Sequence, residues 1–302
     1  MNRLTRAQRR AVIACLVEGS SVRATCRMTG VAKGTVLRFL RDMGEVCEEY
    51  HDTHARGLRS ERIQADEIWS FCYCKEKNLP DCKRGEPGVG SVWTWTALDQ
   101  DSKFMVSWYV GDRDARCAVW FMRDLASRLG NRVELTTDGH HVYERAVEKA
   151  FGWDVDYAQL LKVYGESWDE EARYSPCACL HSMKVPVFGR PIPGDICTSH
   201  VERQNLTMRM GMRRFTRLTN AFSKKLANLR AAVALHFVHY NFCRVHTALR
   251  VTPAMELGIA DHVWELDELV GLLEAREAAA LASGSLKRGP YRKRRKSAAG
   301  SD

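Results

Sequence analysis

Hydrophobic residues recur at helical spacing through the N-terminal part of the chain. Leu4–Glu18 carries apolar side chains three and four positions apart, as expected of a helix with one buried face. Ser21 is a suitable N-cap for a second, short helix, Val22–Met28. Gly30 then allows the positive φ of a tight turn before a third helix, Ala32–Arg41. The pattern therefore predicts three consecutive helices.

The third predicted helix has an apolar face and a basic face. Val36, Leu37 and Leu40 are expected to pack inward. The outward positions are Lys33, Thr35, Arg38 and Arg41. A short helix, a glycine turn and a basic third helix match a helix-turn-helix, whose last helix enters the major groove of DNA. The open alternative is a basic three-helix bundle that contacts another protein.

After residue 60 the pattern changes to β-rich runs interrupted by helical spacing. Three strands are predicted first, at Ile63–Phe71, Val92–Leu98 and Phe104–Val110, with a polar turn between the last two. The elements predicted after them are a helix at Asp114–Leu129, a strand at Val133–Asp138, a helix near Tyr143–Phe151, a strand near Val155–Leu161 and a helix that opens near Ser199. This order predicts an α/β fold, in which an all-α N-terminal segment precedes a mixed β-sheet covered by helices.

Charge and composition narrow the partners of the chain. Its 302 residues carry a net charge of +9, and the positive charge is concentrated at the two ends. Residues 286–302 hold seven Lys/Arg against one Asp, and residues 1–45 hold nine against three acids, which suggests phosphate contacts at both ends. No apolar run approaches the ~18 residues of a membrane span, and no secretory signal is evident, so a cytoplasmic protein without membrane contact is expected.

Three acidic residues occupy places where an acid is unusual. Asp66 lies inside the first strand, Asp138 ends the fourth strand, and Glu202 lies in the opening turn of a later helix. In a mixed sheet flanked by helices, these three positions can converge at one edge. Carboxylate oxygens suit Mg²⁺, and paired Mg²⁺ ions suit displacement at a phosphodiester. The pattern therefore indicates a site for divalent cations.

Each acid has a competing interpretation. Glu67 could be the ligand in place of Asp66, but strand alternation places these two side chains on opposite faces, so only one is expected to face the site. The more polar of the two strand faces favours Asp66. Asp138 also fits a turn at a strand end. Ser199 and Glu202 have the spacing of a capping box, in which the Glu bonds back to the helix cap.

Five segments together resemble bacterial insertion-sequence transposases of the DDE type, with the greatest likeness to the IS-one family. The segments are Asp66–Phe71, Thr136–Gly139, His200–Asn205, Arg213–Arg217 and Tyr240–His246. The resemblance covers about residues 1–260. It implies a ribonuclease-H-like core in which Asp66, Asp138 and Glu202 are the catalytic residues and the metal ligands. Asn241 and His246, in the last segment, are expected to lie on a helix and to pack behind the site.

The resemblance also implies a function and a domain order. It implies a transposase that binds the terminal inverted repeats and target DNA, cleaves and transfers strands with Mg²⁺ or Mn²⁺, and forms a homodimer or higher oligomer on double-stranded DNA. Alternatives are a catalytically inactive DNA-binding regulator and a nuclease without strand transfer. The expected domains are 1–45 (helix-turn-helix), 46–60 (connector), 61–260 (DDE catalytic domain) and 261–302 (C-terminal helix and basic tail).

Further basic and polar residues after Glu202 predict a path for DNA. The predicted contacts are Arg203, Asn205, Arg209, Arg213 and Arg214, with His200 as a possible accessory group. Asn205 is alternatively a hydrogen-bond partner of a ligand carboxylate, and the whole stretch is alternatively a solvated basic face.

Eleven cysteines raise the question of zinc. Cys72, Cys74 and Cys82 form one cluster, and Cys177, Cys179 and His181 form another, but neither has the C-x₂-C spacing of a zinc knuckle. Free thiols are therefore expected rather than structural zinc. The tail at residues 287–296 is expected to add non-specific, salt-sensitive affinity for DNA, and the open alternative is a solubilising tail with no specific role.

Overall fold

The computed structural model describes residues 3–165, 179–216 and 220–284, and it begins with the three predicted helices. They are α1 (Arg6–Val17), α2 (Val22–Thr29) and α3 (Lys33–His54). Ser21 caps α2 by accepting a hydrogen bond from the backbone of Ala24, and Gly30 ends this helix at φ +68°, as predicted. The third helix does not end near Arg41, because Met43, Val46 and Cys47 continue its buried face. Much of the predicted connector at 46–60 is therefore helical.

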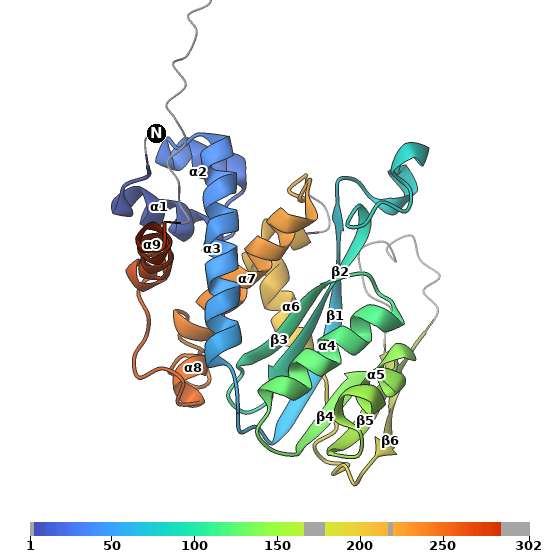
Figure 1. Ribbon diagram of the computed structural model, residues 1–302. Helices are drawn as coiled ribbons and strands as arrows, with labels where there is room; N and C mark the ends of the chain where they lie inside the picture. Colours follow the sequence, from blue (N-terminus) through green and yellow to red (C-terminus); the bar gives the residue numbers. More distant parts are fainter. Residues whose placement is uncertain (1–2, 166–178, 217–219, 285–302) are drawn as a thin grey trace, which may run out of the picture.

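The centre of the molecule is a six-stranded mixed sheet with the order β3-β2-β1-β4-β5-β6 (Figure 1). The strands are β1 (Arg62–Cys72), β2 (Gly90–Asp99), β3 (Met105–Gly111), β4 (Val133–Asp138), β5 (Val155–Tyr164) and β6 (Cys179–Phe188). β1, β2 and β3 form an antiparallel meander, β4 and β5 continue the sheet parallel to β1, and β6 returns antiparallel. The order of the first five strands is that of the ribonuclease-H-like fold, so the predicted fold class is confirmed.

The predicted strands agree with β1 to β5, whereas β6 was not predicted. β6 is an edge strand with mostly exposed side chains, and it contains Pro186, which is tolerated at a sheet edge. Its residues therefore lack the alternation of polar and buried apolar positions that reveals a half-buried strand.

Helices cover both faces of this sheet (Figure 1). α4 (Ala115–Arg128) and α5 (Val142–Phe151) pack together, and α4 lies on β2 and β3. On the other face, α6 (Ser199–Gly211) lies on β1 and β2, and α7 (Leu226–Phe242) lies on β3. The remaining helices of the described residues are the short η1 (Glu76–Asn78), η2 (Asp81–Lys83), η4 (Arg213–Phe215) and α8 (Pro253–Glu256), and the C-terminal α9 (Leu266–Ala282).

Asn241 and His246 were both expected on a helix, but only Asn241 lies on one. The side chain of Asn241, fully buried on α7, accepts a hydrogen bond from the backbone N–H of Met105 (2.9 Å) and donates one to its carbonyl (3.0 Å). This is the packing role expected for it. His246 lies beyond the end of α7 rather than on the helix.

The N-terminal helices are held against the core at two close contacts. α3 packs on α7, and a Cβ at Gly44 would lie 2.3 Å from the Cα of Ala231. At the end of α1, a Cβ at Gly19 would lie 3.0 Å from the carbonyl oxygen of Gly211 at the end of α6. Because glycine has no side chain, both backbones approach closely, and the orientation of the N-terminal helices on the core follows from these contacts.

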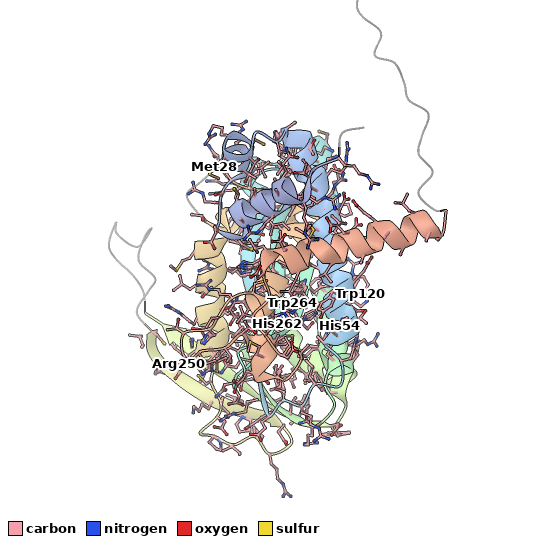
Figure 2. The ribbon with its side chains drawn as sticks, turned by 90° about the vertical axis from the view of Figure 1, so that its left-hand side faces the viewer. Met28, His54, Trp120, Arg250, His262 and Trp264 are labelled. Atoms are coloured by element: carbon pink, nitrogen blue, oxygen red, sulfur yellow. The ribbon has the colours of Figure 1, made fainter. Side chains whose placement is uncertain are left out.

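The C-terminal helix α9 completes the N-terminal helical layer. Glu277 on α9 accepts hydrogen bonds from the buried Arg9 on α1 at 3.0 Å. Trp264, which precedes α9 and is labelled in Figure 2, lies with its ring centroid 5.0 Å from that of Tyr50 on α3. The domain predicted for residues 1–45 is thus covered by residues from the other end of the chain.

Two further expectations from the sequence concern membrane-spanning helices and the cysteines. No helix among the described residues is long and apolar enough to span a membrane. Ten cysteines are described, and all ten are free thiols. Cys177, Arg217 and the basic tail at 287–296 lie outside the described residues.

Candidate functional site

Three carboxylates meet where β1 and β4 run side by side. The parallel register pairs Ala65 with Thr137, which places Asp66 and Asp138 at the next positions along the two strands. Asp66, Glu67 and Asp138 each offer a carboxylate oxygen, and these atoms all lie within 4.8 Å of one another. This acidic group, Asp66–Glu67–Asp138, is the centre of the candidate site.

The presence of Glu67 in the acidic group bears on one prediction from the sequence. The two side chains do point to opposite faces, since Asp66 contacts α6 and Glu67 contacts α5. However, β4 ends at Asp138, so the ladder between β1 and β4 does not continue beside Glu67. A Glu67 oxygen therefore lies within 4.8 Å of oxygens of Asp66 and Asp138 despite the opposite faces, while the choice of Asp66 over Glu67 as the ligand stays a prediction.

Asp66 is held by two hydrogen bonds. Its Oδ1 accepts the backbone N–H of Glu67 (2.8 Å), and its Oδ2 accepts the side-chain amide of Asn205 on α6 (2.7 Å). Burial, followed by the charges of Glu67 and Asp138, raises the pKa of Asp66 to about 7. Crowded carboxylates with raised pKa values are the arrangement that a divalent cation would relieve.

Glu67 is the most enclosed of the three acids, with its side chain only 1% exposed. Its Oε1 accepts a hydrogen bond from Nε of Arg113 (2.6 Å), and its Oε2 accepts one from the hydroxyl of Tyr143 on α5 (2.6 Å). Burial and Asp138 raise the pKa of Glu67, while Tyr143 and Arg113 oppose this shift. Glu67 is thus fixed in place by residues on the opposite sheet face from α6.

Asp138 serves the site and the local turn together. Its Oδ1 accepts the backbone N–H of His140 (3.0 Å), which is the turn contact considered from the sequence. Its carboxylate nevertheless also belongs to the acidic group. The His140 ring lies nearly parallel to that of Trp95, and burial lowers its pKa.

Glu202 is near the acidic group but is not part of it. Its side chain is 44% exposed and forms an ion pair with Lys162 on β5, and its Oε1 also accepts the hydroxyl of Thr198 (2.5 Å). The N-cap of α6 is Thr198, and Ser199 is already helical, so the capping box considered for Ser199 and Glu202 is not formed. The negative charge of Glu202 contributes to the raised pKa of Asp66.

Gln64 connects the acidic group to the start of α6. It is buried on β1 two residues before Asp66, and its Oε1 accepts the backbone N–H groups of His200 (3.0 Å) and Val201 (3.1 Å). It thus satisfies two of the free N–H groups at the helix start. The sequence did not predict that Gln64 binds the start of α6. The available signal was its position on the same strand face as Asp66, where a polar side chain is unusual.

The residues expected to contact DNA divide into exposed and internal groups. Lys33, Arg38, Arg41, Arg203 and Arg213 are exposed, and Thr35, Arg209 and Arg214 are half-buried. Asn205 is buried and binds Asp66, which agrees with its alternative role as partner of a carboxylate. His200 is partly buried beside Gln64, and its pKa is lowered by burial and by Lys103.

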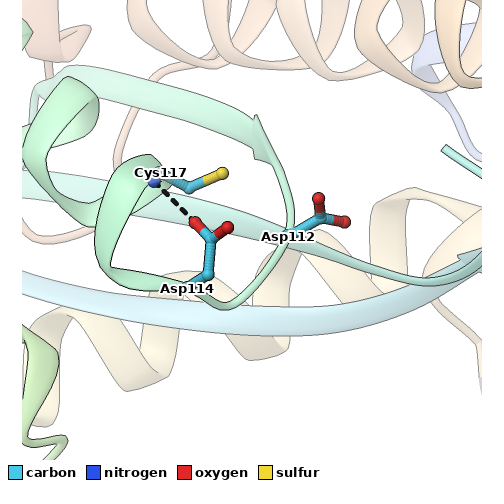
Figure 3. Close-up of side chains that lie close together, drawn as sticks. All are labelled: Asp112, Asp114 and Cys117. Carbon is cyan, nitrogen blue, oxygen red and sulfur yellow. Dashed lines mark hydrogen bonds between the residues drawn. The ribbon is translucent and has the colours of Figure 1, made fainter. Parts of the chain in front are cut away.

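A second group of potential ligands lies at the start of α4, where Asp112, Asp114 and Cys117 come together (Figure 3). Asp114 already serves as the N-cap of this helix, and its Oδ1 accepts the backbone N–H of Cys117 (2.7 Å). Burial raises the pKa of the Cys117 thiol to about 11, which disfavours the thiolate. This group is accounted for by helix capping.

The acidic group offers oxygen ligands only, which suits Mg²⁺ or Mn²⁺ better than zinc. In the cysteine clusters considered from the sequence, Cys72 is buried, and the Cys74 thiol donates to the carbonyl of Asn78 (3.4 Å). The described residues therefore fit a hard divalent cation at the candidate site.

No protein-family model matches the sequence, and no curated protein matches it. Among solved structures, the chain is similar to a piggyBac transposase synaptic complex with hairpin DNA, at 10% identity and a TM-score of 0.36, over 93% of this chain and 72% of that one. It is also similar to the Mos1 transposase paired-end complex with left transposon end (14% identity, TM-score 0.22, over 51% and 60%). A third similar structure is the Mos1 mariner paired-end complex with Mn (13% identity, TM-score 0.22, over 51% and 59%). The fold assignment rests on the strand order, and these solved structures are transposases.

Proposed function

We propose that this protein is a DNA transposase of the bacterial insertion-sequence type, which binds the ends of a mobile element and cuts and joins DNA with divalent metal ions in the cytoplasm. The observation that carries the proposal is the acidic group Asp66–Glu67–Asp138 on a ribonuclease-H-like sheet, beside the helix that bears Glu202. The resemblance of five sequence segments to insertion-sequence transposases is the reason for proposing the bacterial insertion-sequence type, with the IS-one family as the nearest candidate.

In this proposal Asp66, Asp138 and Glu202 hold two Mg²⁺ ions, for which Mn²⁺ can substitute. Bound ions would stabilise charge on the attacking and leaving oxygens of a phosphodiester, first with water and then with a DNA 3′-hydroxyl as nucleophile. Asn205 orients the Asp66 carboxylate, and Gln64 holds the first turn of α6. Glu202 must exchange its ion pair with Lys162 for the metal.

The helices at the N-terminus are proposed to bind the terminal inverted repeats. The exposed Lys33, Arg38 and Arg41, with Thr35, lie on α3, which would enter the major groove. Arg203 and Arg209 on α6, and Arg213 and Arg214 just beyond its end, would contact the DNA backbone. Because strand transfer joins two ends, the active species on DNA is proposed to be a homodimer or a higher oligomer.

The test uses labelled DNA carrying the ends of the protein's own element, a plasmid target, and Mg²⁺, Mn²⁺ or EDTA. We expect metal-dependent nicked and joined products from the wild type, and loss of both from Asp138→Asn and Glu202→Gln. Asp112→Asn is the matched control, since Asp112 belongs to the second acidic group.

Other outcomes would change the proposal. Nicking without joining would identify a nuclease, and end binding without cutting under either metal would identify an inactive regulator. Unchanged nicking by Asp138→Asn would contradict the assignment of the site.

A further inference from the structure

A cleft of about 690 Å³ lies between the N-terminal helices and the core, away from the acidic group. One wall comes from the ends of α1 and α2 around the turn between them and from α3. The other comes from residues 212–214 after α6, from residues 220–224 before α7, and from one side of α7. These segments are far apart in sequence, so the cleft exists only because α3 docks on α7.

The charge of the cleft is entirely positive. Five cations line it, and no Asp or Glu is among the described residues that do so. The cations are Arg23, Lys33, Arg213, Arg214 and Lys224. Between them lie aliphatic side chains such as Leu37 and Leu235, and the aromatic ring of Phe222. Cations around an apolar, partly aromatic floor are typical of sites for single-stranded nucleic acid, where phosphates meet the cations and bases meet the floor.

Two side chains in the cleft carry polar groups that the described residues satisfy only in part. Arg214 is half-buried, its Nε donates to the hydroxyl of Ser223 (2.8 Å), and it forms no ion pair with a carboxylate in the described part of the chain. Burial lowers its pKa to about 10, which still leaves the guanidinium charged at neutral pH. Nε2 of the buried His236 has no hydrogen-bond partner among the described residues. A bound anion would satisfy the charge of Arg214.

Two elements lead from the acidic group to this cleft. α6 carries Glu202 in its first turn and ends next to Met212 in the cleft wall, a path of about 15 Å at ~1.5 Å per helical residue. β1 runs from Asp66 to Cys72, which bridges to Ser223 in the cleft, a path of about 20 Å at ~3.3 Å per strand residue. The distance between the acidic group and the cleft therefore corresponds to a few nucleotides of an extended DNA strand.

The outer face of α6 connects the two sites with solvent-exposed side chains. Arg203, Leu206 and Met210 lie three and four residues apart, so they share one face of the helix. Leu206 is 43% exposed and Met210 is 74% exposed, which is unusual for a pair of large apolar residues on one helix face. A DNA strand along this face would cover both.

We propose that a single DNA strand leaves the acidic site along the outer face of α6 and is held in the basic cleft between the N-terminal helices and the core. The inference rests on the proposed function, since that function supplies the DNA strand. It adds a site for an unpaired strand to the duplex contacts of α3, and Lys33 belongs to both sets because it lies on α3 and lines the cleft. It also gives the exposed Arg23 and Lys224 a role that the duplex contacts do not require.

The test measures binding of a fluorescent 12-nucleotide oligothymidine by anisotropy, in EDTA, at several salt concentrations. Arg23→Glu and Lys224→Glu are suitable because both side chains are exposed. Each is expected to weaken binding of the oligonucleotide by about tenfold, and to lower the salt slope by ~0.7 for each phosphate that the protein no longer neutralises. Arg38→Glu is the matched control, because Arg38 is exposed on α3 but does not line the cleft. It should weaken binding of duplex repeat DNA more than binding of the oligonucleotide.

Unchanged affinity in both cleft variants would overturn the inference. An equal weakening of binding in the cleft variants and in Arg38→Glu would also overturn it, because it would indicate general attraction of a polyanion. The assay needs no cleavage, so a protein that binds the oligonucleotide through the cleft but never nicks DNA would contradict the proposed function alone.

Discussion

The side-chain oxygen of Gln64 accepts hydrogen bonds from the backbone N–H groups of His200 and Val201, at 3.0 and 3.1 Å. This contact joins the strand that carries Asp66 to the first turn of the helix that carries Glu202. Together with the bond from Asn205 to Asp66, it sets the position of one proposed metal ligand relative to another. The geometry of the site therefore depends on residues that need not touch metal or DNA.

Gln64→Leu should lower the free energy of unfolding by about 1–3 kcal/mol. Leucine has no oxygen to accept the backbone N–H groups of His200 and Val201, which lose their partner next to the buried position 64. It should also reduce metal-dependent nicking, since α6 is no longer held at its first turn. Urea unfolding and the nicking assay check these effects. Gln100→Ala is the control, because the Gln100 side chain accepts a hydrogen bond from the Gln64 amide. This substitution removes one partner of Gln64 but leaves the Gln64 oxygen that accepts from α6. Equal effects from both substitutions would show that the link to α6 is unimportant.

The raised pKa of Asp66 should make the metal-free protein less stable as the pH rises. Its pKa is about 7 in the folded protein against 3.8 for an unperturbed aspartate, so between these values the folded state binds more protons than the unfolded state. Stability therefore falls from about pH 4 to pH 7, by on the order of 3–4 kcal/mol. Urea midpoints in EDTA across this range should fall less steeply for Asp66→Asn than for the wild type. Identical slopes for the two proteins would contradict the raised pKa.

Lys162→Met should tighten the binding of Mn²⁺ in the absence of DNA, because it removes the cation that pairs with Glu202. The gain should be about fivefold or less, since the carboxylate is 44% exposed and exposed pairs contribute at most ~1 kcal/mol. Titration calorimetry measures it. Lys184→Met is the control, because the Lys184 ammonium donates to the carbonyl of Pro193 (2.5 Å). Unchanged or weaker Mn²⁺ binding by Lys162→Met would contradict the prediction that Lys162 competes with the metal for Glu202.

Gly44→Ala should destabilise the protein by about 1–3 kcal/mol, because the added Cβ would lie 2.3 Å from the Cα of Ala231 and would push α3 away from α7. Gly34→Ala on the same helix is the control, since no described atom beyond its chain neighbours and the adjacent helix backbone lies within 4 Å of its Cβ position. There, the better helix propensity of alanine should stabilise the protein by up to ~1 kcal/mol. Thermal or urea unfolding distinguishes the two variants, and a stable Gly44→Ala protein would refute the close packing.

Sequence periodicity was sufficient for most of the secondary structure, because the buried faces of α1 to α5 and β1 to β5 repeat at the helix or strand period. It also identified Asp66 and Asp138, since an acid within or at the end of a buried strand stands out from its surroundings. It did not reveal β6, whose exposed edge position imposes no such repeat. It ended α3 too early, although Met43, Val46 and Cys47 continue the buried face of the helix beyond Arg41.

The sequence by itself determined the order of α1 to α5 and β1 to β5, the basic face of α3 and the acids at strand positions, since these depend on local spacing and residue type. Only the tertiary structure decided that Glu67 joins Asp66 and Asp138, that Gln64 holds α6, and that Glu202 pairs with Lys162. It also decided that distant cations line one cleft. The physical reason is that such contacts join residues tens to more than a hundred positions apart, and strand register and helix docking, rather than local periodicity, set their distances.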